Sequence, residues 1–318
     1  MTVRIAMVGA GAFGTKHLEG LANIADAEVV ALVSTPRGKA DELAERFGIP
    51  HVSESLDDVL ADPDVDAVIL ATPTPLHASQ ALACLSAGKH VEVEIPLCDA
   101  LADGEAVVAK AAETGLVAMV GHTRRFNPSH QWVHRRVTSG DLHIQQMDVQ
   151  TYFFRRSNLN ALGEPRSWTD HLLWHHAAHT VDLFQYQTGG TVVAAQAVEG
   201  PLHPELGIAM DMSIQLKVDT GAILTLSLSF NNDGPFGTVF RYIGDTGTYV
   251  ARYDDLFDGN DAPINLSGLT VSSNGIELQD REFVGAIGEG RQPNASAADV
   301  LPCYEVLDRI ERQLLAAR

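Results

Sequence analysis

Three glycines close to the N-terminus limit what this chain can fold into more than any other feature. Gly9, Gly11 and Gly14 have the spacing G-x-G-x-x-G, an apolar run precedes them at residues 3–8, and residues 15–24 carry apolar side chains at helical spacing. In a strand–turn–helix unit of this kind the first glycine makes the turn, the second admits a pyrophosphate and the third allows close helix packing. The sequence therefore predicts a dinucleotide at this turn, contacted by Gly9, Gly11, Ala12, Phe13 and Gly14.

The end of the second apolar run, residues 28–33, indicates which dinucleotide is bound. NAD-binding units place a carboxylate here for the ribose hydroxyls, but this chain has Ser34, followed by Thr35 and Arg37. Hydroxyl groups and a guanidinium suit the 2′-phosphate of NADP, which an arginine can hold through paired hydrogen bonds. We therefore expect NADP as the cofactor, with its 2′-phosphate bound by Ser34, Thr35 and Arg37.

Strand and helix patterns alternate as far as about residue 121. Apolar runs at residues 65–71, 90–94 and 116–120 are separated by segments of helical pattern. This alternation predicts a parallel sheet with helices on both faces, and ligands at the carboxyl ends of its strands. We expect an α/β fold in which residues 1–121 form an NADP-binding Rossmann domain.

Residues 122–318 have a different pattern, and we expect them to form the substrate-binding and oligomerisation domain. Residues 142–154 and 210–218 have strand patterns, and residues 296–317 predict a closing helix that packs back toward the first domain. Short glycine-containing turns separate β-like runs at residues 219–221, 244–247 and 273–275. Recurring hairpins of this kind indicate an α+β domain with an antiparallel sheet.

Composition excludes several classes of partner. The formal net charge of −19 argues against binding to nucleic acid or anionic membranes. No apolar run reaches the length of a membrane span, and the first strand pattern leaves no room for a secretion signal, so we expect a cytoplasmic protein. Cys84, Cys98 and Cys303 form no disulfide or metal pattern and are expected to be buried thiols.

Beyond the glycines, further motifs resemble the Gfo/Idh/MocA oxidoreductases over essentially the whole chain. They are T-P-T-x-x-H at residues 72–77, G-K-H-V at 88–91, E-I-P at 94–96, R-R-F at 124–126 and H-x-x-D at 179–182. The resemblance implies a nicotinamide-dependent oxidoreductase with a large, mostly antiparallel sheet in its second domain, through which it forms a homodimer. It also implies that further cofactor contacts come from Thr72, Pro73, Thr74, His77, Glu94, Ile95 and Pro96.

Two positions depart from the pattern of that family. The family turn is usually Glu-Lys-Pro, with a lysine that takes part in proton transfer, whereas this chain has Ile95. The family also tends to carry an acid four residues before its catalytic histidine, where this chain has His175. The usual proton relay for sugar oxidation is therefore incomplete in this chain.

A narrower resemblance within the family accounts for both departures. Residues 121–128, 148–156 and 163–179 resemble dehydrogenases that use NADP to oxidise the cyclic hemiacetal of a dicarboxylate during bacterial breakdown of aromatic acids. Such a reaction removes one hydride and one hydroxyl proton. A histidine can accept that proton without the help of a lysine.

Candidate site residues follow from this chemistry. His179 is the expected general base, Asp182 one turn later is placed to orient its ring, and His175 is the second candidate for the base. The substrate carboxylates need cations and hydrogen-bond donors, because carboxylates bind most strongly to such groups. We expect these groups to be Arg124 and Arg166, assisted by His122, Thr169 and Arg125.

Some of these arginines have alternative roles. Arg125 could tie the two domains together rather than contact a ligand. Arg155 and Arg156 follow a strand, so that one of them could point to solvent.

The histidine-rich segment also has the spacing of a metal-binding helix. His171, His175 and His179 recur every four residues and share one face if the segment is helical. No cysteine or glutamate completes a known metal motif, so we expect no metal site. His176 lies off this face and is expected to be structural.

Two other functions stay open at this point. The chain could be an NADP-binding sensor without catalysis, or a dehydrogenase of an uncharged sugar lactol. His179 and the arginine-rich segments favour the enzyme over the sensor. The number of arginines favours a small dicarboxylate over a neutral sugar as the substrate.

Overall fold

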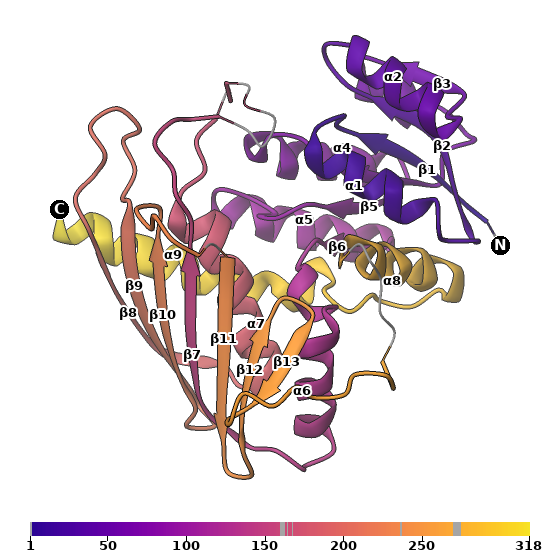
Figure 1. The fold of residues 1–318 in the computed structure, drawn as a ribbon. Coiled ribbons are helices and arrows are strands. Elements are labelled where there is room, and N and C mark those ends of the chain that lie inside the picture. The colour runs from indigo at the N-terminus through magenta and orange to yellow at the C-terminus, as the bar shows by residue number, and fades with distance from the viewer. Residues whose placement is uncertain (1, 160–162, 164, 167, 236, 270–274) are drawn as a thin grey trace. The chain divides into compact units, whose positions relative to one another are not determined.

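The computed structural model describes residues 2–159, 163, 165–166, 168–235, 237–269 and 275–318. The chain divides into two compact units, drawn in Figure 1. Unit 1 comprises Met1–Thr123 and Ser272–Leu301, and unit 2 comprises Arg124–Val271 and Pro302–Arg318.

The sheet of unit 1 is parallel throughout. Its strands are β1 (Val3–Val8), β2 (Ala27–Val33), β3 (His51–Ser53), β4 (Ala67–Leu70), β5 (His90–Val93) and β6 (Ala118–Val120). They lie in the order β3-β2-β1-β4-β5-β6, so the order reverses between β1 and β4. Every residue of β4 is buried, as expected for a central strand covered on both faces. The predicted Rossmann fold is therefore confirmed.

The helices of unit 1 match the sequence patterns with one exception. They are α1 (Ala12–Leu21), α2 (Gly38–Phe47), α3 (Leu56–Leu60), α4 (His77–Ser86), α5 (Leu101–Thr114) and α8 (Gly275–Glu289). The hairpin turn predicted at residues 273–275 is wrong where the structure describes it, because Gly275 begins α8 instead of a strand. The other two residues of that turn lie outside the described residues.

Unit 2 contains a mixed, mostly antiparallel sheet, as predicted. Its strands are β7 (Ile144–Tyr152), β8 (Val192–Glu199), β9 (Asp211–Val218), β10 (Ile223–Ser229), β11 (Gly237–Gly244), β12 (Thr248–Arg252) and β13 (Asp255–Asp258). The order is β13-β12-β11-β7-β10-β9-β8, and among the described residues only the β7–β10 pairing is parallel. The predicted turns at residues 219–221 and 244–247 join β9 to β10 and β11 to β12.

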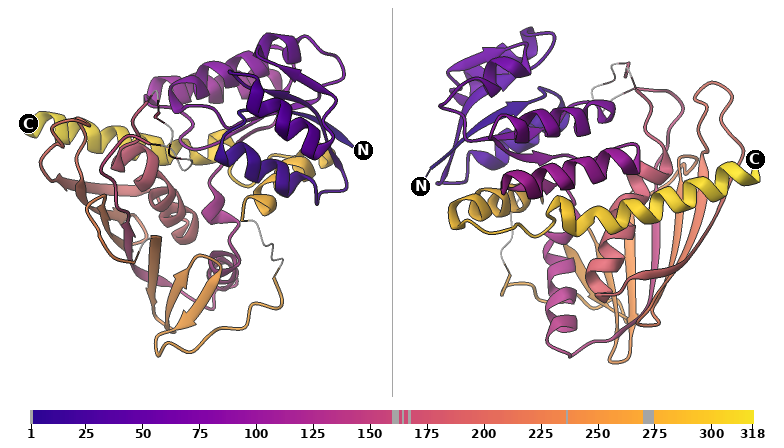
Figure 2. Two further views of the ribbon diagram at one scale, coloured as in Figure 1. Left: turned by 45° about the horizontal axis from the view of Figure 1, so that its top comes forward. Right: turned by 180° about the vertical axis from the view of Figure 1, so that it is seen from behind.

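Helices cover one face of this sheet. Figure 2 shows α6 (Pro128–Thr138) and α7 (Ala178–Thr188) on that face. The last helix, α9 (Ala297–Ala317), runs along the same face. Residues of β9 alternate between buried and exposed positions, which is the pattern of a sheet with one covered face. On the exposed side Val193, Val198 and Ile223 leave 56%, 70% and 41% of their surface accessible.

Two further expectations concern the whole chain. Cys84, Cys98 and Cys303 are buried free thiols, as predicted. Within the part of the chain that the structure describes, no helix combines the length and the apolar character that crossing a bilayer requires.

Candidate functional site

In the glycine turn of unit 1, the surroundings of Gly9, Gly11 and Gly14 fit the role that the sequence predicts for each of them. Gly9 has a φ of +114°, and a Cβ there would lie 2.3 Å from the Ala71 carbonyl oxygen. A Cβ at Gly14 would lie 1.9 Å from the Gly9 carbonyl oxygen, so α1 can approach β1 only without a side chain. At Gly11, by contrast, no heavy atom lies within 4 Å of that position. The turn therefore leaves open space beside the N-terminus of α1, which fits a pyrophosphate.

The segment after β2 contains the residues expected to select the cofactor. The Ser34 backbone N–H donates to the Ser53 carbonyl at 3.1 Å, and the Thr35 hydroxyl donates to the Glu54 carbonyl at 3.1 Å. Arg37 donates through Nε to Asp41 Oδ1 at 2.9 Å, in a pair whose two side chains are about half exposed. A surface pair of this kind contributes little free energy, so the Arg37 guanidinium can exchange Asp41 for a phosphate.

The two other predicted cofactor segments meet at the carboxyl ends of β4 and β5. The His77 ring links them, because Nε2 lies 2.8 Å from the Thr72 carbonyl oxygen and Nδ1 lies 2.7 Å from the Pro96 carbonyl oxygen. The structure thus brings together the turns that contain Thr72, Pro73 and Thr74 on one side and Glu94, Ile95 and Pro96 on the other. Since Gly9 contacts Ala71 at the end of β4, the glycine turn lies next to them.

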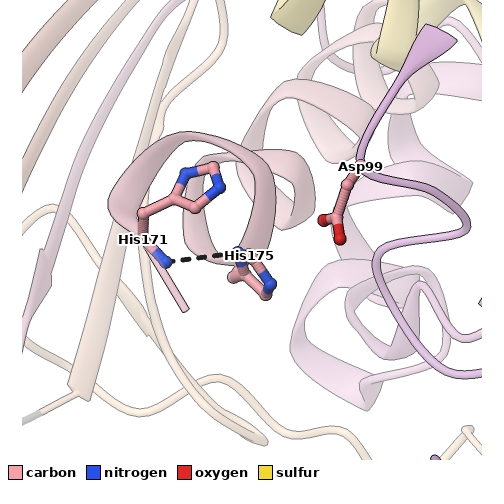
Figure 3. A group of neighbouring side chains, drawn as sticks. All are labelled: Asp99, His171 and His175. Carbon is pink, nitrogen blue, oxygen red and sulfur yellow. Dashed lines mark hydrogen bonds between the residues drawn. The ribbon is translucent and has the colours of Figure 1, made fainter. Parts of the chain in front are cut away.

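In unit 2 the histidine-rich segment is helical, but it begins as a π-helix. The π-helical residues Leu172–Ala177 run directly into α7, and His171 precedes them in an extended conformation. Figure 3 shows the His171 backbone N–H donating to His175 Nδ1 at 3.2 Å. The two rings are 4.8 Å apart and nearly perpendicular. A π-turn is frequent at functional sites and is not visible in a periodicity of apolar residues.

The candidate bases occupy different positions along this segment. Trp168 stacks on the His175 ring with a centroid distance of 5.1 Å and an interplanar angle of 20°. His179 is half-buried in the first turn of α7. Thr169, predicted to assist substrate binding, accepts a hydrogen bond from Asn158 Nδ2 at 3.1 Å. His122, the other predicted assistant, is fully buried just after β6 in unit 1.

Asp170 forms ion pairs with two arginines of unit 2. Its carboxylate accepts from Arg166 Nη1 at 2.7 Å and from Arg155 Nη2 at 2.7 Å, and His176 Nε2 lies 3.3 Å away. His176 also packs against the rings of Phe153 and Phe230, which agrees with its predicted structural role.

This Asp170 cluster (Arg155, Arg166, Asp170 and His176) has an excess of positive charge. Burial and the nearby Arg155 and Arg166 lower the pKa of His176 to about 3, so its ring is neutral at physiological pH. Burial and the neighbouring Arg166 also lower the pKa of Arg155 to about 10, which still leaves that guanidinium charged. Two cations therefore share one carboxylate, and the cluster can attract a second anion.

Arg124 is a second source of unmatched positive charge. Its guanidinium lies 5.4 Å from the ring centroid of Tyr253 and 6.0 Å from that of Phe240, and burial lowers its pKa. Nη1 makes a long, 3.5 Å contact with Asn127 Oδ1. Among the described residues no carboxylate forms an ion pair with Arg124. Arg124 is half-buried, and the charge of Asp254 acts on it without forming an ion pair. An anionic ligand beside the guanidinium would therefore bind favourably.

Both halves of the chain match models of oxidoreductase families. Residues 3–122 match the family model described as "Oxidoreductase family, NAD-binding Rossmann fold", and residues 128–270 match "Bacterial oxidoreductases, C-terminal". The chain is 66% identical over 312 residues to 4-carboxy-2-hydroxymuconate-6-semialdehyde dehydrogenase of Sphingobium sp. strain SYK-6, covering 98% of this chain and 99% of that enzyme. This chain belongs to the Gfo/Idh/MocA oxidoreductase family.

More distant relatives agree with that membership. The scyllo-inositol 2-dehydrogenase (NAD(+)) of Bacillus subtilis is 27% identical over 247 residues, covering 75% of this chain and 70% of that enzyme. The structure of a levoglucosan dehydrogenase in complex with NADH and levoglucosan has the same fold, with a TM-score of 0.88 at 20% identity, covering 100% of this chain and 98% of that one. This Gfo/Idh/MocA protein is therefore an oxidoreductase of a nicotinamide-dependent family.

Within this oxidoreductase the R-R-F and H-x-x-D motifs meet in a buried ion pair. Arg125 donates through Nε to Asp182 Oδ2 at 2.8 Å and through Nη2 to Asp182 Oδ1 at 2.6 Å, and both side chains are at least 94% buried. The Arg125 guanidinium also lies 4.7 Å from the Tyr186 ring centroid. The pair joins η2 (Thr123–Arg125), just before α6, to α7. The sequence had suggested neither this partner for Asp182 nor this one for Arg125.

This pairing predicts strong coupling in stability. Arg125→Ala and Asp182→Ala should each lower the free energy of unfolding by roughly 3–5 kcal/mol, because each leaves one charge buried without its partner. The double variant should lose less than the sum of both. Urea unfolding measures all three, with Arg46→Ala as the control, since its pair with Glu19 is exposed and worth less than about 1 kcal/mol. Small, additive losses would contradict the pairing.

Proposed function

We propose that this oxidoreductase uses NADP to oxidise the cyclic hemiacetal form of 4-carboxy-2-hydroxymuconate-6-semialdehyde to 2-pyrone-4,6-dicarboxylate. The reaction belongs to the protocatechuate 4,5-cleavage pathway for aromatic compounds. The observation that carries the proposal is the surplus of guanidinium charge in unit 2, at Arg124 and in the Asp170 cluster. The 66% identity to the Sphingobium enzyme named for this semialdehyde supports the same substrate.

Charge selects this substrate over a neutral sugar lactol. A dicarboxylate offers two anions, and unit 2 has two places where positive charge exceeds negative charge. An arginine holds a carboxylate through two parallel hydrogen bonds, which fix the orientation of the ring as well as its affinity. We assign one substrate carboxylate to Arg124 and the other to Arg166, with Thr169 and His122 as additional donors.

Proton removal is the chemical task that falls to the chain itself. The nicotinamide ring, when bound, supplies the acceptor for the hydride. The hemiacetal hydroxyl must lose its proton as the carbonyl forms, and with Ile95 in place of the usual lysine a histidine has to accept it. We assign this role to His179, with His175 as the second candidate. Arg125 holds Asp182 in α7 one turn beyond His179, so that Asp182 orients that turn.

The cofactor contacts proposed for unit 1 follow the turns described above. Gly9, Gly11, Ala12, Phe13 and Gly14 would hold the pyrophosphate, and the T-P-T and E-I-P turns would flank the nicotinamide half. Ser34, Thr35 and Arg37 would bind the 2′-phosphate, because Ser34 stands where NAD-specific units have an acid.

The remaining proposals concern organisation. We propose that residues 1–121 bind NADP and that residues 122–318 bind the substrate and form the oligomer contact. The exposed apolar side chains Val193, Val198 and Ile223 on the uncovered sheet face support a homodimer formed through that sheet. We propose the cytoplasm as the location, in keeping with a catabolic enzyme that consumes a soluble cofactor.

Cofactor preference is tested at Arg37. Arg37→Ala should raise the KM for NADP by on the order of tenfold or more, because it removes charge-assisted hydrogen bonds to the 2′-phosphate. The KM for NAD should stay nearly unchanged, and Ser34→Asp should shift the preference toward NAD. Arg46→Ala, in the last turn of the helix that Arg37 precedes, is the control and should leave both constants unchanged. An equal increase in KM for NADP and NAD would show that Arg37 does not bind the 2′-phosphate.

The role of the base is tested at His179. His179→Ala should lower kcat by a factor on the order of 10² or more, since general-base catalysis contributes about that much. Cofactor affinity, measured by NADPH fluorescence, should stay intact. His143→Ala, an exposed histidine of unit 2, should behave as wild type. Normal turnover by His179→Ala would rule out this base and direct the same test to His175.

Recognition of a carboxylate is tested at Arg124. Arg124→Ala should lower kcat/KM for the dicarboxylate by roughly 30-fold or more, because the charge pair between the guanidinium and the substrate carboxylate is lost. Arg124→Lys should recover only part of the activity, since lysine lacks the paired donors. With an analogue that lacks the carboxylate bound by Arg124, the alanine substitution should lower kcat/KM much less. Arg135→Ala on α6 serves as the control. If Arg124→Ala lowers kcat/KM equally for the dicarboxylate and the analogue, Arg124 does not bind that carboxylate.

A further inference from the structure

A buried polar cluster in unit 1 has no part in the reaction described above. His17 of α1, Glu92 of β5 and Asp280 of α8 each place one nitrogen or oxygen atom within 4.8 Å of the others. All three residues have 0% of their surface exposed. Close packing of α8 on α1 brings them together, since a Cβ at Gly20 would lie only 3.0 Å from the Glu277 Cα.

Two carboxylate oxygens in this cluster have no hydrogen-bond partner among the described residues. Glu92 Oε1 accepts a hydrogen bond from Gln279 Nε2 at 2.8 Å, and the Gln279 amide is oriented by the Thr123 hydroxyl, which donates to its Oε1 at 2.8 Å. Glu92 Oε2 is completely buried and has no hydrogen-bond partner among the described residues. Asp280 Oδ2 is in the same state. Buried carboxylate oxygens normally have partners, so each of these calls for a ligand.

The His17 ring lies between two buried carboxylates. Its Nδ1 lies 2.8 Å from Asp280 Oδ1, and its Nε2 lies 3.1 Å from Glu94 Oε1. A histidine that binds a metal through one ring nitrogen almost always donates its other N–H to a carboxylate, which fixes the ring. Glu94 can fill that supporting role and leave Nδ1 for an ion.

The charges of the cluster point in the same direction. Glu92, Glu94 and Asp280 are three buried carboxylates, and among the residues that the structure describes they share one cationic partner, His17, which pairs with Glu94 and Asp280. A protonated His17 leaves the three carboxylates with two surplus negative charges, whereas a divalent ion bound to the neutral ring would leave one.

We propose that His17 Nδ1, Glu92 Oε2 and Asp280 Oδ1 bind a divalent transition-metal ion, for which Zn²⁺ is the probe. One imidazole and two carboxylates suit Zn²⁺, and no sulfur ligand is needed. The His17–Asp280 contact would widen from 2.8 Å to roughly 3.3 Å, the spacing of two ligands on a tetrahedral zinc. Asp280 Oδ2 can supply a further ligand.

This ion would be structural, because its ligands are buried and tie α1, β5 and α8 into one unit. It departs from the expectation that the chain has no metal site. No motif could reveal it, since the ligands are 75 or more residues apart in the sequence.

Metal content and thermal unfolding test the proposal directly. Protein purified without chelator should contain about one equivalent of metal per chain by mass spectrometry of the elements. Protein stripped with a chelator should gain thermal stability when Zn²⁺ is added, because binding to the folded state alone stabilises it. Co²⁺ in place of Zn²⁺ should give visible absorption bands from a site with nitrogen and oxygen ligands.

Variants separate a bound metal from a hydrogen-bonded cluster. Glu92→Gln keeps the shape of the side chain and should weaken Zn²⁺ binding by on the order of 100-fold, because it removes a ligand. Glu277→Gln on the same helix as Asp280 is the matched control, and it should keep the metal, since Glu277 instead pairs with Arg281. The proposal is overturned if wild-type protein contains no metal and Zn²⁺ leaves its unfolding temperature unchanged. Equal Zn²⁺ affinity in wild type and Glu92→Gln would overturn it as well.

Discussion

The contact between two backbones at Gly9 and Gly14 is the constraint on which unit 1 depends. A side chain at either position would collide with a carbonyl oxygen, of Ala71 in one case and of Gly9 in the other. Without side chains, α1 starts directly at the end of β1 and the β4 turn closes against the same point. His77 then joins the β4 turn to the β5 turn through two carbonyl oxygens. The residues proposed to hold the pyrophosphate and the nicotinamide half of the cofactor are positioned by this one arrangement.

In unit 2 the feature that matters most for the proposed function is the local distribution of charge. The chain has a net charge of −19, yet two arginines of unit 2 are placed around the single carboxylate of Asp170. Arg125 is fully matched by Asp182, whereas Arg155 and Arg166 share Asp170. Arg124 has no ion-pair partner among the residues described by the structure. Because the whole protein repels anions, an anionic substrate must be held by local cations, and these are the groups placed to do so.

Patterns along the sequence predicted the local parts of this account. The glycine turn, the parallel sheet and the alternating strand β9 all follow from spacing that a few residues express. The hairpin expected at residues 273–275 failed because Asn-Gly, a common turn signal, is here followed by helix α8. The π-helical segment at residues 172–177 could not be predicted either, because a segment this short does not set up a recognisable spacing of apolar residues.

Partners far apart in the sequence could not be predicted. The sequence placed Asp182 beside His179 by spacing alone, and only the fold shows Arg125, 57 residues away, holding both of its oxygens. The same holds for Asp170, which gathers Arg155 from the end of a strand and Arg166 from a loop. His17, Glu92 and Asp280 are a third example, because their association depends on the packing of α8 against α1.

The central claim is that this oxidoreductase acts on a dicarboxylate hemiacetal with NADP. The most direct measurement mixes the purified protein with NADP and freshly cleaved protocatechuate, and follows NADPH absorbance together with the product by chromatography. The account predicts NADPH and 2-pyrone-4,6-dicarboxylate in equal amounts, with a much slower reaction when NAD replaces NADP. Absence of NADPH formation with this substrate, or turnover only of neutral sugar lactols, would contradict it.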